Sequence, residues 1–383
     1  MFDDLGIYIL QNAWKGYNCS LFAYGQTGSG KSYTIMGPNG GVSGFSGSEA
    51  GIMPRMCGKL FKMLEQGRAQ GASGDFTDMH IEMSYLEVYN EQLSDLLAPN
   101  ADGSKSKLEI HEYPQTGVIV KGLSKHAVAN FEEIQDLMQD GNNFRAMAST
   151  ARNATSSRSH AICTLYLSQH RSEGREMVTK FSRIHLVDLA GSENAGIHHG
   201  IRDKAKKRAT LKETSSINKS LFTLSICIAT LAKQKQRGKT HVPYRNSVLT
   251  MLLKDSLGGN ARTVMIANIS PDARDRGQTL STLRYAGLAK KIQMHAKVNE
   301  IRKEKMLSEL KAEIEELRQR LKDQARDEAL QRELREKNAA MEDVENMSMD
   351  WSRKRRNTMA MRAERGQALG LRGISNGNDT VNM

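Results

Sequence analysis

The chain has 383 residues, and 55 Lys plus Arg against 43 Asp plus Glu leave a net charge of +12. Such a charge favours a polyanionic partner, but it does not distinguish nucleic acid, an anionic membrane and an acidic protein surface. The four cysteines are far apart with no C-x-x-C pair, which argues against a zinc site or disulfide framework and for a reducing compartment. Asp3 and Asp4 replace a basic leader, and no apolar run approaches about 18 residues, so secretion and membrane spanning are not expected.

The first elements in the chain lead into a glycine-rich loop. Leu5, Ile9 and Trp14 are spaced as on a helix, and the apolar run 21–24 predicts a buried strand after it. Residues 25–32 then match G-x-x-x-x-G-K-[ST], in which glycines curl backbone N–H groups around a phosphate. Lys31 would reach the β- and γ-phosphates and Ser32 would bind Mg²⁺. A chance glycine-rich turn is the alternative, and the preceding strand argues against it.

Two further signatures lie at residues 153–160 and 188–193. Before them, the sequence predicts a Gly/Ser-rich loop over 37–51 and a strand over 81–89. In residues 153–160, the hydroxyls of Ser156 and Ser157 suit phosphate, Mg²⁺ and an attacking water. A strand predicted over 184–187 ends in Asp188, a carboxylate placed to hold the magnesium water shell.

Three residues near these signatures suit a nucleotide-dependent switch. The Gly191 N–H can bond a γ-phosphate and lose that bond when the phosphate leaves. Arg158 and Glu193 could close over the phosphate as a bidentate pair. The alternative for these two residues is a pair of unrelated surface charges, which would contribute little.

With these motifs, the sequence resembles the kinesin motor domain. Residues 153–160 (NATSSRSH) and 188–193 (DLAGSE) match the family's switch I and switch II, and the likeness continues at 217–221, 241–250 and 279–286. The resemblance implies an α/β P-loop NTPase of the kinesin motor fold, with a central, mostly parallel sheet flanked by helices and followed by a helical neck. It also implies ATP hydrolysis coupled to microtubule binding.

The resemblance assigns roles to individual residues. The implied catalytic residues are Ser156, Ser157, Arg158, Gly191 and Glu193. The implied ATP-binding residues are Gly25, Gln26, Thr27, Gly28, Ser29, Gly30, Lys31, Ser32 and Tyr33, with the tyrosine against the adenine. The implied Mg²⁺ ligands are Ser32, Ser157 and, through water, Asp188.

Basic residues near the elements that face the microtubule in kinesins are expected to bind the acidic filament. They are Arg202, Lys204, Lys206, Lys207, Lys219, Lys233, Lys235, Arg237, Lys239 and Arg245. Such charge runs are usually solvated surface, and their position in the resembling scaffold is what favours a filament contact. The resemblance thus implies a cytoplasmic protein on microtubules, with neither a nucleic-acid partner nor a transmembrane segment.

The expected organisation is a motor domain over 1–296, a neck linker over 297–305, a neck helix over 306–345 and a basic, disordered tail over 346–383. Leu307, Leu310, Ile314, Leu317 and Leu321 keep the spacing of a coiled-coil seam for about two heptads, which leaves a homodimer and a lone amphipathic helix equally open. A neck after the motor resembles kinesins with N-terminal motors, which implies movement toward microtubule plus ends. The basic stretch before His241, residues 279–286 and the short neck together resemble the third kinesin class most. Cargo is not predicted.

Departures from the family pattern define the alternatives. The family's first strands and its R-x-R-P adenine motif are absent, so the motor domain is expected to be incomplete at its N-terminus, with an apolar sheet edge exposed. A catalytically impaired microtubule-binding kinesin fragment is therefore the alternative to an ATP-driven motor. A generic P-loop NTPase acting on nucleic acid is a weaker one, because the kinesin-type serine motif argues against it.

Overall fold

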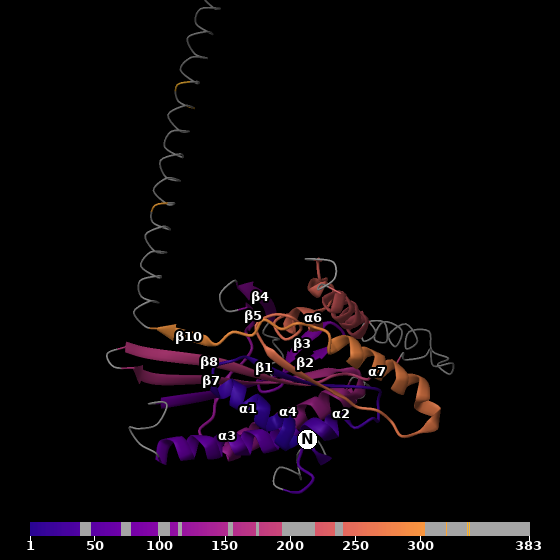
Figure 1. Cartoon of the computed structure of the whole chain (residues 1–383), viewed down its shortest axis with the longest axis horizontal. Helices are drawn as coiled ribbons and strands as arrows, with labels where there is room; N and C mark the ends of the chain where they lie inside the picture. The colour runs from indigo at the N-terminus through magenta and orange to yellow at the C-terminus, as the bar shows by residue number, and fades with distance from the viewer. Residues whose placement is uncertain are drawn as a thin grey trace, which may run out of the picture. The chain divides into compact units, whose positions relative to one another are not determined.

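The computed structural model describes residues 1–38, 47–69, 78–98, 108–113, 117–151, 156–173, 176–193, 219–233 and 240–302, together with Gln319, Arg335 and Lys337. The chain divides into two compact units, Met1–Lys305 and Met306–Met383. The first unit is an α/β domain (Figure 1). The three described residues of the second unit are helical, and the rest of the predicted neck helix and tail lies outside the described residues.

One sheet forms the centre of the domain. Its strands are β1 (Cys19–Tyr24), β2 (Asp78–Tyr89), β3 (Gln92–Asp95), β6 (His126–Ala127), β7 (His160–Glu173), β8 (Glu176–Asp188), β9 (Arg262–Ala267) and β10 (Asn299–Arg302). The strand order is β3-β2-β7-β8-β1-β9, with β6 beside β2 and β10 beside β8. The predicted strands at 21–24, 81–89 and 184–187 lie in β1, β2 and β8 and are confirmed.

The expected α/β fold with a sheet flanked by helices is confirmed, but the expectation of a mostly parallel sheet is wrong. Among the described strands, β1 pairs in parallel with β8 and β9, and every other pairing in this sheet is antiparallel. The long strands β7 and β8 are separated by two residues, a connection that only antiparallel strands allow. The parallel part is confined to β8, β1 and β9, where Asp188 lies opposite Ala23 at the carboxyl ends.

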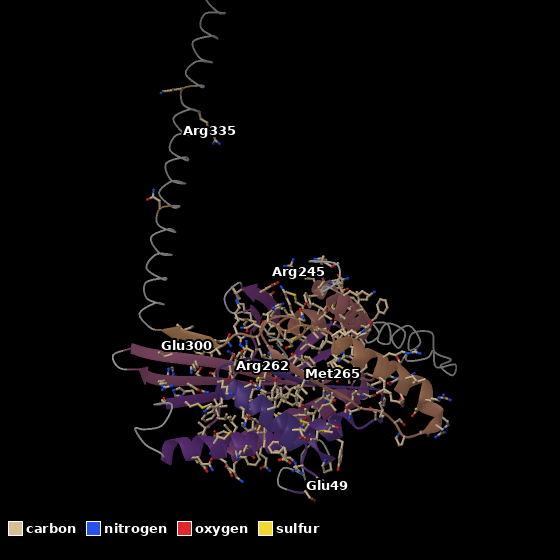
Figure 2. The ribbon with its side chains drawn as sticks, in the orientation of Figure 1. Glu49, Arg245, Arg262, Met265, Glu300 and Arg335 are labelled. Atoms are coloured by element: carbon tan, nitrogen blue, oxygen red, sulfur yellow. The ribbon has the colours of Figure 1, made fainter. Side chains whose placement is uncertain are left out.

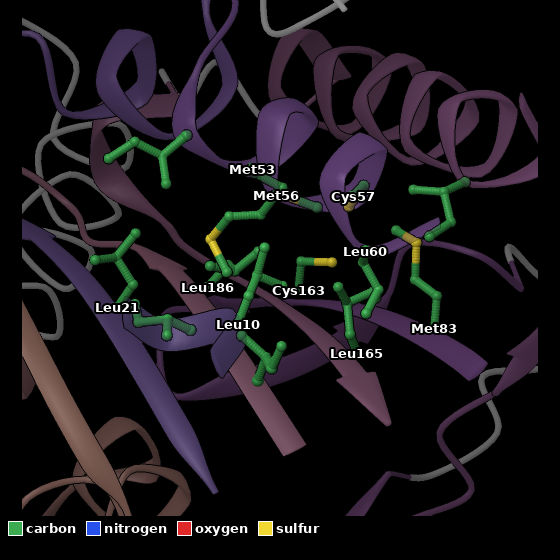
Figure 3. Close-up of a cluster of buried hydrophobic side chains, with 14 of the residues drawn as sticks. Leu10, Leu21, Met53, Met56, Cys57, Leu60, Met83, Cys163, Leu165 and Leu186 are labelled. Carbon is green, nitrogen blue, oxygen red and sulfur yellow. The ribbon is translucent and has the colours of Figure 1, made fainter. Parts of the chain in front are cut away.

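Helices cover both faces of the sheet, and each layer encloses a hydrophobic cluster. On one face lie α1 (Ile7–Trp14), α2 (Lys31–Met36), α3 (Ile52–Ala69) and α4 (Phe131–Ala151), and on the other lie a helix over 219–233, α6 (Val248–Leu252) and α7 (Arg276–Ala289) (Figure 1). The alternation of strand side chains divides the residues between the layers, since Leu21 packs in the first cluster and Phe22 in the second. Figure 3 shows Leu186 between Leu21 and Cys163 in the first cluster, in agreement with the strand register.

The N-terminal helix forms as predicted, with its first turn as a π-helix, η1 (Phe2–Gly6), before α1. Gly16 follows at φ 94°, a left-handed conformation that ends the helix before β1. A separate hairpin, β4 (Glu109–Tyr113) and β5 (Gly117–Lys121), lies beside α6 (Figure 1). Part of the predicted loop over 37–51, residues 39–46, lies outside the described residues.

Candidate functional site

The predicted phosphate loop, residues 25–32, connects β1 to α2 at the carboxyl end of the parallel strands. Gly28 and Gly30 have φ values of 80° and 89°, which glycine adopts without the steric cost of a Cβ. Gly25 is required by packing, because a Cβ there would lie 2.1 Å from the carbonyl oxygen of Asn268. The motif therefore folds into a tight turn that only its glycines permit.

The loop holds its lysine against its own backbone. The Lys31 Nζ donates to the carbonyl oxygen of Gln26 at 2.8 Å, and the Ser29 hydroxyl donates to the same carbonyl at 2.7 Å. Burial lowers the pKa of Lys31, and the carboxylates of Asp188 and Glu193 oppose that shift. The effect of burial on Lys31 thus outweighs the attraction of these two carboxylates, and an anion bound beside the Nζ would further stabilise the charged form.

The residues around Asp188 fit a hydrated magnesium ion. Asp188 is the last residue of β8, and its Oδ2 accepts a hydrogen bond from the Ser32 hydroxyl at 2.5 Å. Its Oδ1 is buried with no hydrogen-bond partner among the described residues. The described residues contain no group of three or more His, Cys, Asp and Glu that could hold a metal. One carboxylate with a hydroxyl is nevertheless the usual protein contribution to a Mg²⁺ that keeps waters and phosphate oxygens.

The two predicted switch segments lie against each other and against the phosphate loop. Ser157 and Arg158 belong to a short 3-10 helix, η4 (Ser156–Arg158), directly before β7. The Gly191 N–H donates to the carbonyl oxygen of Ser157 at 2.8 Å, and the Ser192 N–H donates to that of Gly25 at 3.0 Å. Main-chain hydrogen bonds thus join the second switch both to the first switch and to the phosphate loop, which lies more than a hundred residues earlier in the sequence.

Glu193 lies against the phosphate loop. Its Oε2 accepts from the Thr27 N–H at 2.7 Å, and its Oε1 accepts from the Thr27 hydroxyl. Carboxylate oxygens therefore occupy donors in the loop that is predicted to bind phosphate. The predicted closing pair of Arg158 with Glu193 stays a prediction.

Tyr33 lies on α2 with 52% of its surface exposed. It lines an open pocket of about 350 Å³ together with Thr34, Ile52 and Arg55. An exposed aromatic ring two residues after Lys31 is available for stacking, which is what the adenine assignment requires. That assignment stays a prediction.

A buried ionic cluster behind the switches was missed from the sequence. Arg145 on α4 donates through Nε to Glu87 Oε1 at 3.2 Å and through Nη2 to the Ser159 hydroxyl at 3.0 Å. Its Nη1 lies 3.8 Å from Asp188 Oδ2. Burial opposes the charge of Arg145, but Tyr85, Asp188 and Glu87 raise the pKa above its ordinary value. No local motif marks this arginine, because its partners come from three distant segments.

Three of the ten predicted filament residues are described. Lys219 and Lys233 lie at the two ends of the helix over 219–233, and Arg245 lies in η5 (Tyr244–Asn246). Figure 2 shows Arg245 on the side of the domain that carries β4, β5 and α6. The other seven lie outside the described residues: Arg202, Lys204, Lys206, Lys207, Lys235, Arg237 and Lys239.

Two glutamates that the sequence analysis did not identify form ion pairs with two of these basic residues, Lys219 and Arg245. Glu91 has φ 59° in the turn between β2 and β3, and its carboxylate accepts from Lys219 Nζ at 3.4 Å and from the Val248 N–H at 3.1 Å. Glu112 of β4 lies 3.7 Å from the Arg245 guanidinium and also bonds Lys254. The positive charges of Lys219 and Arg245 are therefore partly neutralised by carboxylates of the same domain.

A second pocket and the hydropathy of the helices bear on what else the domain could do. A pocket of about 630 Å³ between α3 and the start of α4 contains none of the predicted nucleotide residues. In the described part of the chain, no helix combines the length and apolar character needed to span a membrane.

Comparisons with known proteins agree with this geometry. The family profile described as the kinesin motor domain matches residues 1–292. Kinesin-like protein KIF13A of Mus musculus is 43% identical over 383 residues, covering 98% of this chain and 20% of that protein. Kinesin-related protein 1 of Dictyostelium discoideum is 46% identical over 321 residues, covering 83% of this chain and 14% of that protein. The chain therefore spans at most 20% of the length of these two relatives.

Solved structures give the same result. A KIF14 dimer in the two-heads-bound state, with AMP-PNP and in complex with a microtubule, matches with a TM-score of 0.65 and 44% identity, covering 78% of each chain. The structure of a fast kinesin matches with a TM-score of 0.67 and 37% identity, again covering 78% of each chain.

Proposed function

We propose, from the premise that this chain belongs to the kinesin motor domain family, that it is a microtubule motor that hydrolyses ATP to ADP and phosphate. The observation that supports the proposal is the hydrogen bonding of Gly191 to Ser157 and of Ser192 to Gly25, which joins the three segments that are predicted to contact phosphate. The Gly191 N–H can donate either to the Ser157 carbonyl or to a γ-phosphate. Binding and loss of that phosphate would therefore move both switches.

Each charged group of the pocket has a chemical task in this proposal. Mg²⁺ would neutralise charge on the β- and γ-phosphate oxygens. Ser32, Ser157 and, through water, Asp188 are the residues that would hold it. Lys31 would supply a fixed positive charge to the same oxygens, and Ser156 and Ser157 would orient the attacking water.

Glu193 has two alternative partners in this cycle. Its carboxylate bonds the Thr27 N–H and hydroxyl, donors that a polyphosphate in the loop would also seek. Phosphate binding would displace Glu193 from Thr27, because two anions cannot share these donors. The released carboxylate could then pair with Arg158 and close the site over the γ-phosphate.

The proposed partner is the microtubule. Support comes from the exposed cations Lys219, Lys233 and Arg245 and from the solved KIF14 dimer, which is bound to a microtubule. We infer a place on the cytoskeleton from the same evidence. Plus-end direction, membership of the third kinesin class and a homodimer through residues 306–345 remain predictions from the sequence.

Steady-state ATPase with and without microtubules tests the proposal, after circular dichroism has shown that the purified chain is folded. We expect turnover that rises strongly with microtubule concentration. Glu193→Ala should bind ATP but not hydrolyse it, because the closing carboxylate is lost. Normal turnover in that variant would remove the assignment, and a folded protein that binds microtubules without turnover would establish the impaired binder instead.

A further inference from the structure

A buried histidine joins the second switch to the helix that carries Lys219. His160 is the first residue of β7, and the residue is 2% exposed. Its Nδ1 accepts from the Ala190 N–H at 3.0 Å, and its Nε2 lies 2.9 Å from the hydroxyl of Ser220. The ring therefore spans the gap between two segments that are distant in sequence.

The contacts determine the protonation of this ring. A backbone N–H can only donate, so the Nδ1 that accepts from Ala190 carries no proton. In the neutral ring the proton then resides on Nε2, which donates to the Ser220 hydroxyl. Burial, reinforced by the charges of Arg145 and Lys31, lowers the pKa of His160 to about 3, which keeps the ring neutral. The same tautomer thus serves both partners.

The two partners belong to segments with different tasks. Ala190 precedes Gly191, whose N–H bonds the first switch through Ser157. Ser220 follows Lys219 in the helix over 219–233, whose buried residues Leu221 and Leu224 pack on the sheet. A displacement of Ala190 by an ångström would break its bond to His160 or carry the ring with it, because hydrogen bonds weaken steeply with distance and angle.

We propose that His160 is a positioning residue that couples movement of residues 190–191 to the helix over 219–233, and so couples the nucleotide pocket to the filament surface. The inference rests on the proposed function for the meaning of that surface. The simpler interpretation is that His160 is a core residue whose polar atoms happen to be satisfied. The two interpretations predict different results when the bond between His160 and Ser220 is lost. Only the positioning role predicts a weaker response of ATP turnover to microtubules.

The main test is Ser220→Ala, which removes one hydroxyl and leaves the bond between His160 and Ala190 in place. We expect basal ATPase to be unchanged and the ratio of microtubule-stimulated to basal turnover to fall about fivefold, the effect of one lost neutral hydrogen bond. Ser225→Ala is the matched control, because that hydroxyl lies on the same helix and, among the described residues, bonds only the Phe222 carbonyl, at 2.7 Å. A stimulation ratio equal to that of the control would overturn the proposal.

A second variant guards against an effect of Ser220→Ala on the helix alone. His160→Asn keeps an acceptor for Ala190 and loses the reach to Ser220, so it should lower the stimulation ratio as far as Ser220→Ala does. The double variant should then be no worse than either single variant, since both remove the same bond. Additive losses would mean that the two residues act separately and would refute the link.

Hydrogen exchange provides a readout that does not depend on microtubules. In the parent chain, Mg·AMP-PNP should change the protection of amides in residues 219–233, and in Ser220→Ala that change should fall by at least half. A parent without microtubule stimulation would refute the proposed function, whereas the exchange experiment would still decide the link. An equal response in parent and variant would refute the link alone.

Discussion

Replacing Arg145 with methionine is expected to destabilise the domain more than any surface substitution. The Arg145 side chain is 11% exposed and its guanidinium lies between the carboxylates of Glu87 and Asp188, whose side chains are 6% and 8% exposed. Its removal takes the guanidinium away from both buried carboxylates, although Lys31 still attracts Asp188 through space, and breaking a buried pair in this way costs about 3–5 kcal/mol of unfolding free energy. Because domains are stable by about 5–15 kcal/mol, such a loss is readily measured.

Two variants separate charge from geometry at this position. Arg145→Lys keeps the cation but cannot reproduce the fork that reaches Glu87 and Ser159 from separate nitrogens, so its stability should lie between those of the parent and Arg145→Met. Arg274→Met is the matched control, because Arg274 forms an exposed pair with Asp272 and should not change the stability measurably.

The assay is equilibrium unfolding in urea, read by circular dichroism, together with basal ATPase. Arg145→Met should shift the midpoint strongly and lower basal turnover, since Asp188 and Ser159 lose their common partner. The reasoning is refuted if Arg145→Met unfolds at the same urea concentration as Arg274→Met, or if it loses stability while turnover is fully retained.

Three further outcomes are expected. Glu91→Ala should lower the unfolding free energy by about 1–2 kcal/mol in urea, because it removes the charged acceptor of the Val248 N–H and of Lys219; an unchanged midpoint would contradict this. Glu112→Gln should tighten microtubule binding about two- to fivefold at low salt by releasing Arg245, and the gain should vanish at high salt; co-sedimentation at two ionic strengths decides. Burial lowers the pKa values of His160 and His185 to about 3 and about 4, so below about pH 6.5 the unfolded chain binds protons that the native chain does not. The unfolding free energy should therefore fall by up to about 1.4 kcal/mol per pH unit for each histidine and level off below those pKa values. Unfolding midpoints that do not move between about pH 7.5 and 4.5 would refute this.

The local features of the site could be predicted from the sequence, because their requirements are local. The glycines of the phosphate loop, the strand before it and Asp188 at the end of another strand are read from neighbouring residues, and the structure has them as expected. The parallel sheet was predicted wrongly because strand direction depends on connections. Nothing in the residue pattern of 160–188 distinguishes a hairpin of two long strands from strands that pair elsewhere.

The supporting residues could not be predicted, because their partners are brought together only by the fold. Arg145 meets Glu87 across 58 residues of sequence, and Glu91 meets Val248 across 157. Glu91 also adopts φ 59°, a conformation that sequence would assign to glycine or asparagine. The bonds of its carboxylate to two other segments offset that strain, and neither bond leaves a local signature.

Two side chains at the start of β7 point to opposite faces of the sheet, which explains how one segment reaches both helical layers. Ser159 and His160 are consecutive and point to opposite faces of the sheet, so Ser159 meets Arg145 of α4 while His160 meets Ser220 of the helix over 219–233. The two links should therefore fail in different ways. Loss of Arg145 removes support from Asp188 and should lower turnover with or without a filament, whereas loss of the Ser220 hydroxyl should leave basal turnover intact and weaken only its response to microtubules. If the Arg145 and Ser220 variants changed basal and microtubule-stimulated turnover equally, the two helical layers would not have separate roles and this reasoning would be wrong.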